Sequence, residues 1–137
     1  MITEQIEVMA EWKQISLKVK GEHGIKILAD EHWILEAITN IVKNAIEHST
    51  VGSEVLIQKE DNAVYTAVKV TDYGEGMDEE ECRHIFERFY RSKRAKADSV
   101  GIGLSLAQEI VKQHGGNITV DSRKDYGTTF AIKLMKN

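Results

Sequence analysis

Residues 33–46 read WILEAITNIVKNAI, a nearly continuous apolar stretch that is interrupted by two asparagines, Asn40 and Asn44. Asp30 stands where it can cap a helix, so we predict a mostly buried helix over about residues 31–48. The asparagines are four residues apart and therefore share one face of that helix. A buried amide costs free energy unless it is hydrogen-bonded. Either neighbouring backbone and water satisfy both amides, or this face lines a polar pocket.

The pocket alternative has chemical content, because an amide oxygen is a hard, neutral ligand of the kind that suits Mg²⁺. His48 and Glu36 extend the polar stripe by one turn in each direction. The stripe drifts around the helix over that distance. We therefore expect Glu36 to be solvated, or to lie behind the residues that touch a ligand.

The composition indicates one globular domain. The chain has 137 residues, which suits a single core. It contains no apolar run near the roughly 18 residues that a membrane helix needs. A net charge of −4 argues against an electrostatic nucleic-acid binder. The single cysteine, Cys82, excludes an internal disulfide and indicates a reducing compartment, so we expect a cytoplasmic domain.

Hydrophobic periodicity divides the rest of the chain into short helices and paired strands. The predicted helices cover residues 2–12, 78–83 and 104–114, and the predicted strand pairs are 14–20 with 25–28, 53–59 with 63–71, and 117–122 with 128–135. This order predicts an α/β (α+β) two-layer sandwich, in which helices pack on one face of a mainly antiparallel mixed sheet.

Closely spaced glycines follow one of these strands, in a chain without proline. Asp72 ends the strand, and Gly74 and Gly76 come directly after it. A carboxylate at this point can accept a hydrogen bond from an exocyclic amine such as adenine N6. The glycines would let the backbone pass close to a planar ring. Taken alone, the same residues are better explained by a plain turn after a strand.

A second glycine segment, formed by Gly101, Ile102, Gly103 and Leu104, runs directly into the predicted helix over 104–114. Free amides at a helix start, with glycines that permit close approach, form an anion site suited to phosphate. The segment is not a P-loop, because the Gly-Lys-Ser/Thr ending is absent. It is not a dinucleotide fingerprint either, because the third glycine is missing.

Two further segments are open to a plain and a functional interpretation. Thr128 and Thr129 begin the last strand, where they are either ligand contacts or ordinary β-branched strand residues. Residues 84–100 are rich in arginine and lysine, among them Arg88 and Arg91. This segment is a solvated loop, an anion-binding patch for a partner, or a lid that brings cations to a triphosphate.

Together these segments resemble the catalytic, ATP-binding domain of bacterial sensor histidine kinases, within the wider GHKL ATPase group, over residues 12–135. The similar motifs are the family's N box (NIVKNA, 40–45), G1 box (DYGEG, 72–76), F box (IFERFYR, 85–91), G2 box (GIGLSL, 101–106) and last glycine box (GTTF, 127–130). The F box is the most specific, because other GHKL branches lack it. The resemblance implies a two-layer α/β sandwich with a flexible ATP lid over roughly residues 77–100.

The resemblance also implies roles for single residues. Asn44 would chelate Mg²⁺, and Asn40 would lie where ATP-hydrolysing relatives carry a catalytic Glu. Asp72 would bind adenine, and Arg88 or Arg91 would reach the γ-phosphate. The other implied contacts to the nucleotide are His48, Gly74, Gly76, Gly101, Ile102, Gly103, Leu104, Thr128 and Thr129, with Lys43 as a further cation for the phosphates.

The chain departs from the family pattern in three ways. Glu47 stands where the family often has Lys or Arg, and Ser105 stands where a third Gly is common. None of the five histidines has the Ser-His-Glu-like context of the family's phosphoacceptor. We therefore expect an excised catalytic domain over residues 13–137, preceded in 1–12 by the tail of a linker from a missing dimerisation domain.

The expected activity is that of a protein histidine kinase. The domain, a monomer by itself, would transfer the γ-phosphate of Mg-ATP to a histidine of the dimerisation domain and release ADP. A response regulator would be reached through the full-length protein, whose attachment to the inner membrane stays open. Two other functions also stay open: a GHKL regulatory module that binds nucleotide without phosphotransfer, and a serine kinase of the anti-sigma type, against which the F box argues.

Overall fold

The computed structural model describes residues 4–20, 32–88 and 103–135. Its helices are α1 (Glu4–Lys13), α2 (His32–His48), α3 (Glu79–His84) and α4 (Gly103–Gln113), and its strands are β1 (Ser16–Lys20), β2 (Glu54–Asp61), β3 (Tyr65–Asp72), β4 (Gly116–Arg123) and β5 (Gly127–Met135). The predicted strand over 25–28, residues 89–100 of the predicted lid, Gly101 and Ile102 lie outside the described residues. Within the described ranges, no helix has the length and apolar character needed to cross a membrane.

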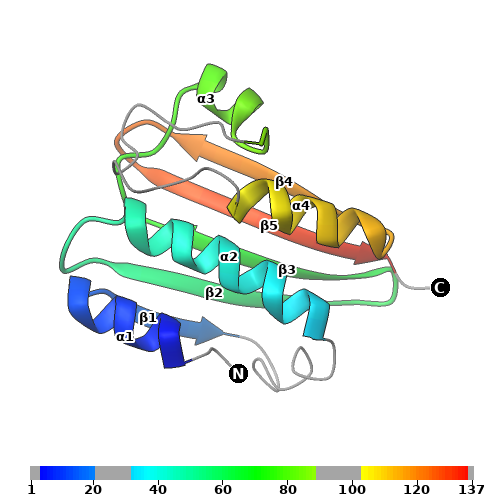
Figure 1. Cartoon of the computed structure of the whole chain (residues 1–137), viewed down its shortest axis with the longest axis horizontal. Helices are drawn as coiled ribbons and strands as arrows, with labels where there is room; N and C mark the ends of the chain where they lie inside the picture. Colours follow the sequence, from blue (N-terminus) through cyan, green and yellow to red (C-terminus); the bar gives the residue numbers. More distant parts are fainter. Residues whose placement is uncertain (1–3, 21–31, 89–102, 136–137) are drawn as a thin grey trace.

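The strands in the described ranges form one sheet in the order β1-β2-β3-β5-β4, so β3 is central. The pairs β2–β3, β3–β5 and β4–β5 are antiparallel, as predicted for the two later hairpins. Helices α1, α2 and α4 lie over one face of the sheet, and α3 lies next to β4 (Figure 1). The predicted two-layer sandwich with a mainly antiparallel mixed sheet is therefore confirmed.

The first strand has a neighbour that the sequence did not predict. Strand β1 pairs with β2 in parallel, with Leu17 opposite Val55. A parallel pair needs a crossover connection, and here α2 lies between the two strands in the chain. The hairpin partner that we predicted for β1, residues 25–28, lies outside the described residues.

The core lies between the helices and the sheet. A row of apolar side chains crosses four strands beneath α2 and α4, formed by Ile57, Val70, Phe130 and Val120 in register. Phe86, which follows α3, packs edge-on against Phe130 with ring centroids 6.0 Å apart. Phe86 thus anchors the segment after α3 to the core.

Helix α1 belongs to the same core. Its Ile6 is 1% exposed, and Lys13 donates hydrogen bonds from Nζ to the carbonyl oxygens of Ile46 and Glu47 at the end of α2. A cation at this position also interacts favourably with the helix dipole. Most of the segment that we expected to be a linker tail, residues 1–12, is therefore part of a helix that packs with this domain.

Glycine is required where the end of the central strand meets its neighbours. A Cβ atom on Gly74 would overlap the carbonyl oxygen of His48 at the end of α2, and one on Gly76 would overlap that of Arg123 at the end of β4. Gly76 also has a φ of +72°, which other residues rarely adopt. Backbone therefore fills the space that we had expected these glycines to leave for a planar ring.

Gly74→Ala is expected to lower the free energy of unfolding by about 3 kcal/mol or more, because neither α2 nor β3 can retreat without disturbing the core. Gly103→Ala is the matched control, since its Cβ would lie 3.6 Å from Asn40 Oδ1, an ordinary contact distance. Urea unfolding of both variants checks this prediction. Equal stabilities for the two variants would show that the packing at Gly74 is not limiting.

Candidate functional site

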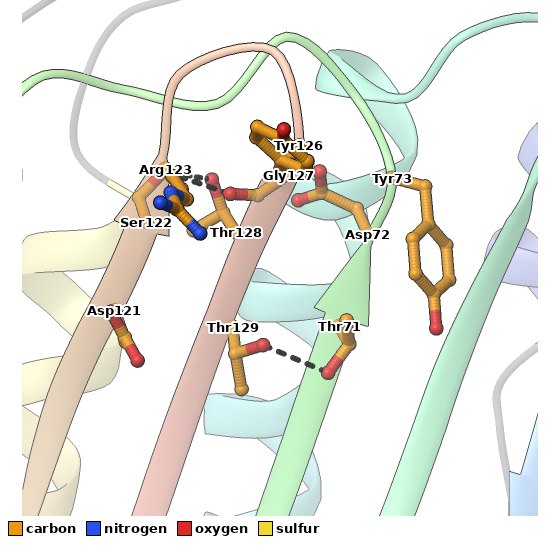
Figure 2. A pocket seen from close by; sticks show the side chains of 10 residues that line it. All are labelled: Thr71, Asp72, Tyr73, Asp121, Ser122, Arg123, Tyr126, Gly127, Thr128 and Thr129. Carbon is orange, nitrogen blue, oxygen red and sulfur yellow. Dashed lines mark hydrogen bonds between the residues drawn. The ribbon is translucent and has the colours of Figure 1, made fainter.

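The helix-covered face of the sheet turns polar at one end. Asp72, Thr128 and Ser122 lie in register across β3, β5 and β4, one row beyond the apolar row of Val70 and Phe130. Asp72 is 3% exposed and Thr128 is 6% exposed. The hydroxyl groups of Thr128 and Ser122 are 2.7 Å apart and hydrogen-bonded (Figure 2). The polar row is thus built into the sheet and is held by its own hydrogen bonds.

The loop after β3 is fixed over this polar end. The backbone amide of Met77 donates to Ser122 Oγ at 2.7 Å. The amide of Asp125, in the turn between β4 and β5, donates to the carbonyl oxygen of Glu75 at 2.6 Å. These bonds join two loops that are far apart in the sequence and keep residues 73–77 next to the buried carboxylate.

A small cavity lies where the polar row meets α2. Its lining residues come from α2, β3, the loop after β3, α3 and β5: Asn44, His48, Asp72, Glu75, Gly76, Met77, Glu81 and Thr128. Asn44 and His48 are one turn apart on α2, so the predicted polar stripe does face the polar end of the sheet. The free volume of about 20 Å³ admits about one water molecule.

The pKa of the buried Asp72 carboxyl group is raised. Burial raises the pKa of Asp72 to about 6, although hydrogen bonds from the backbone amides of Gly74 and Thr128 and the charge of Lys13 all oppose this rise. The bond from the Gly74 amide to Asp72 Oδ1 is 3.0 Å long. The Asp72 carboxylate has therefore lost most of its hydrating water, and the hydrogen bonds from the protein replace that hydration only in part.

The asparagines of α2 differ in their surroundings. Asn40 donates from Nδ2 to the carbonyl oxygen of Glu36 at 3.2 Å, so backbone satisfies part of this amide. Within the described ranges, the side chain of Asn44 makes no hydrogen bond. Glu36 itself is exposed, as predicted.

The start of α4 meets the same face of α2. Gly103 is the first residue of α4, and a Cβ on it would lie 3.6 Å from Asn40 Oδ1. The first turn of α4, whose amides lie at the positive end of the helix dipole, is therefore beside the asparagine stripe. The structure thus brings Asn40, Asn44 and Gly103 together, as the sequence predicted.

Other predicted site residues lie elsewhere. Side chains alternate along a strand, so Thr129 faces the opposite side of the sheet from Thr128. There the Thr129 hydroxyl is 3.0 Å from that of Thr71, in an open hollow of about 520 Å³ that Asp121 and Tyr126 also line (Figure 2). The structure therefore does not bring Thr129 to the small cavity.

Four further residues do not line the cavity. The side chain of Leu104 packs in the hydrophobic core. Lys43 is half-buried on α2, and Arg88 is exposed just beyond α3. Glu47 lines a groove between α1 and α2 together with Trp12, so it lies on a different side of α2 from Asn44. Arg91, like Gly101 and Ile102, lies outside the described residues.

Sequence analysis missed three side chains of the cavity wall: Glu75, Met77 and Glu81. Asp78, the first residue of the helix predicted over 78–83, caps α3 by accepting a hydrogen bond from the Glu81 amide at 2.8 Å. That pattern indicates a helix start, and nothing in it shows that Glu81 is buried. The burial of Glu81 depends on how α3 packs against the sheet, which the local sequence does not indicate.

The comparisons with known proteins identify the family of this chain. The sequence model of a family described as "Histidine kinase-, DNA gyrase B-, and HSP90-like ATPase" matches residues 29–137. Sensor histidine kinase YvrG of Bacillus subtilis is 37% identical over 129 residues, which are 93% of this chain and 22% of that protein. Heme sensor protein HssS of Staphylococcus saprophyticus is 40% identical over 112 residues, which are 82% of this chain and 24% of that protein. The chain thus spans about a quarter or less of these relatives.

Solved structures give the same result at the level of the fold. The catalytic domain of histidine kinase ThkA matches with a TM-score of 0.76 and 27% identity, over 96% of this chain and 87% of that one. The mycobacterial sensor histidine kinase MprB matches with a TM-score of 0.73 and 25% identity, over 96% and 93% of the two chains. The chain therefore belongs to the histidine kinase-, DNA gyrase B- and HSP90-like ATPase family, and within it to the ATP-binding catalytic domains of sensor histidine kinases.

Proposed function

We propose that this domain holds Mg-ATP and transfers its γ-phosphate to a histidine on a separate dimerisation domain. The observation that carries the proposal is the convergence of Asn44, His48, Asp72 and Thr128 on one cavity beside the start of α4. The groups differ in chemistry from one end of this site to the other. A buried acceptor, Asp72, lies at one end, and the side-chain amide of Asn44 and the backbone amides of the first turn of α4 lie towards the other.

The buried end suits a purine base with an exocyclic amine. The ionised Asp72 carboxylate would accept a hydrogen bond from adenine N6, and it would recover part of the solvation that it has lost. Thr128 supplies a hydroxyl beside it. Because the cavity admits only about one water molecule, entry of the base requires part of the wall to move outward.

The end of the site towards Asn44 and the start of α4 suits the phosphates. Amides of the first turn of α4 would bind phosphate oxygens, and Gly103 leaves room for their approach. Asn44 would hold Mg²⁺ together with the phosphates, and the ion when bound would neutralise their charge. Asn40 would position the reacting groups, and Lys43, Arg88 and Arg91 would supply further positive charge.

The transfer step needs a nucleophile from outside the domain. A neutral imidazole nitrogen would form a bond to the γ-phosphorus as the bond to the bridging oxygen breaks, and ADP would leave. The protein contributes mainly positioning and charge neutralisation. We further propose that the domain is a cytoplasmic monomer, and that the full-length protein passes the phosphate to a response regulator.

Asn44→Ala is expected to weaken ATP binding in the presence of Mg²⁺ by about tenfold, because one metal ligand is lost. Binding without metal should change little. Calorimetric titration with and without Mg²⁺ checks both statements, and Asn117→Ala, at an exposed position of β4, is the control. Equal Mg²⁺ dependence in the parent and Asn44→Ala would remove Asn44 from the metal site.

Asp72→Asn is expected to change stability in a pH-dependent way. Since the folded pKa is raised, the native state binds the proton more tightly than the unfolded chain between about pH 4 and 6. The parent's free energy of unfolding therefore falls as pH rises through this range and stays lower above it. The Asp72→Asn variant lacks this fall. Its free energy of unfolding should therefore rise by about 2–3 kcal/mol relative to that of the parent between pH 4 and pH 8.

Urea unfolding over this pH range gives the difference between the two proteins. The same variant should lose most of its preference for ATP over GTP in calorimetry, because the charged acceptor is gone. A stability difference that is constant with pH would contradict the burial of a charge at Asp72.

The transfer itself is tested with labelled ATP and a separately made, histidine-bearing dimerisation domain. We expect the label to appear on the histidine and to be lost on brief acid treatment, as for a phosphoramidate. Tight nucleotide binding without any label on the histidine would instead support a regulatory module without phosphotransfer.

A further inference from the structure

Glu81 is a buried carboxylate for which the fold provides no full set of partners. The residue is 4% exposed, and its Oε2 atom has no hydrogen-bond partner among the described residues. It lines the same small cavity as Asp72. A buried polar atom without a partner costs free energy, so its presence calls for an explanation.

The capping of α3 does not supply that explanation. The cap is made by Asp78, which accepts from the Glu81 amide, so it uses the backbone of Glu81 rather than its carboxylate. A capping box would add one bond from a Glu81 oxygen back to the Asp78 amide and would leave the other oxygen free. Helix caps are also formed at the surface, so capping does not require the burial of Glu81.

We propose that Glu81 reads the base: its Oε2 accepts a hydrogen bond, directly or through one water molecule, from the exocyclic amine of a bound adenine. This assignment rests on the proposed function and adds a second specificity residue to that site. An amine carries two N–H donors. Asp72 would accept from one of them and Glu81 from the other, so the ligand would supply the partner that Oε2 lacks.

The same pair of carboxylates would reject other bases. A purine with a carbonyl oxygen at C6, such as hypoxanthine, would direct an acceptor at two buried acceptors. A site with unpaired buried polar groups discriminates strongly against ligands that cannot pair with them. Glu81 therefore acts through selectivity between bases rather than through the phosphates.

Calorimetry with three nucleotides separates these roles: ATP, inosine triphosphate, and purine riboside triphosphate, which has no group at C6. Glu81→Met removes the acceptor at similar length, and Glu81→Gln keeps a neutral acceptor. We expect Glu81→Met to weaken ATP binding by about tenfold and Glu81→Gln by a smaller factor. Neither variant should lose affinity for purine riboside triphosphate, and the preference for ATP over inosine triphosphate should fall in both.

Glu80→Met, at the neighbouring exposed position of α3, is the matched control and should behave as the parent. Losses that are equal for ATP and purine riboside triphosphate, or unchanged ATP binding in Glu81→Met, would overturn the assignment while leaving the proposed function intact. If Glu81→Met does not fold, the same comparison on Glu81→Gln decides the question. Failure of the folded parent to bind any of the three nucleotides would refute the proposed function, and this assignment with it.

Discussion

Asp72 is held in the interior at the end of the central strand by two backbone amides, and burial still keeps its pKa near 6. A carboxylate in this state disfavours its own ionisation and so weakens the fold above pH 6. A ligand that donates a hydrogen bond to it offsets this cost. A buried group that is unfavourable for folding is thus also one that gains from a bound amine, which connects stability and recognition at one residue.

The hydrophobic core determines where that carboxylate lies. Val70 and Phe130 form a row beneath the helices, and the strand alternation that buries Val70 also buries Asp72 two residues later. On α2, the apolar side chains that cover this row lie next to the polar stripe of Asn40, Asn44 and His48. The cavity lies where both periodic patterns change from apolar to polar. Close backbone packing at Gly74 then holds the end of α2 against the end of β3.

Much of this could be predicted from the sequence, because it depends on local periodicity. The long helix, its polar stripe with Asn44 and His48, and the two later hairpins follow from spacing along single elements, whereas the meeting of that stripe with Asp72 was implied by the resemblance to the family's motifs. Side chains alternate between the two faces of the sheet along β5, so Thr128 and Thr129 should have been assigned to opposite faces. Both were assigned to the site because the family motif contains them as adjacent hydroxyl residues. The parallel pairing of β1 with β2 and the burial of Glu81 depend on how distant elements pack. Local patterns carry no signal for either.

The glycines show the same division between local and distant effects. Their sequence spacing indicated close approach, which is correct, but the approaching group is backbone of α2 and β4 at the Cβ positions of Gly74 and Gly76. One residue type permits contact with a ligand and with protein equally well. Only the arrangement of the elements distinguishes the two. By contrast, a Cβ on Gly103 would meet the side chain of Asn40 at an ordinary contact distance of 3.6 Å, so no backbone occupies that position.

The two hollows at this end of the sheet provide a direct test, because they lie on opposite faces and share Asp72 and Thr128 in their walls. A titration of the ¹⁵N-labelled domain with a non-hydrolysable ATP analogue, followed by amide and side-chain NMR shifts, decides between them. We expect the largest changes at Asn44, Gly76 and Gly103, with small ones at Thr71 and Asp121. Large changes at Thr71, Asp121 and Tyr126, with Asn44 unaffected, would contradict this expectation.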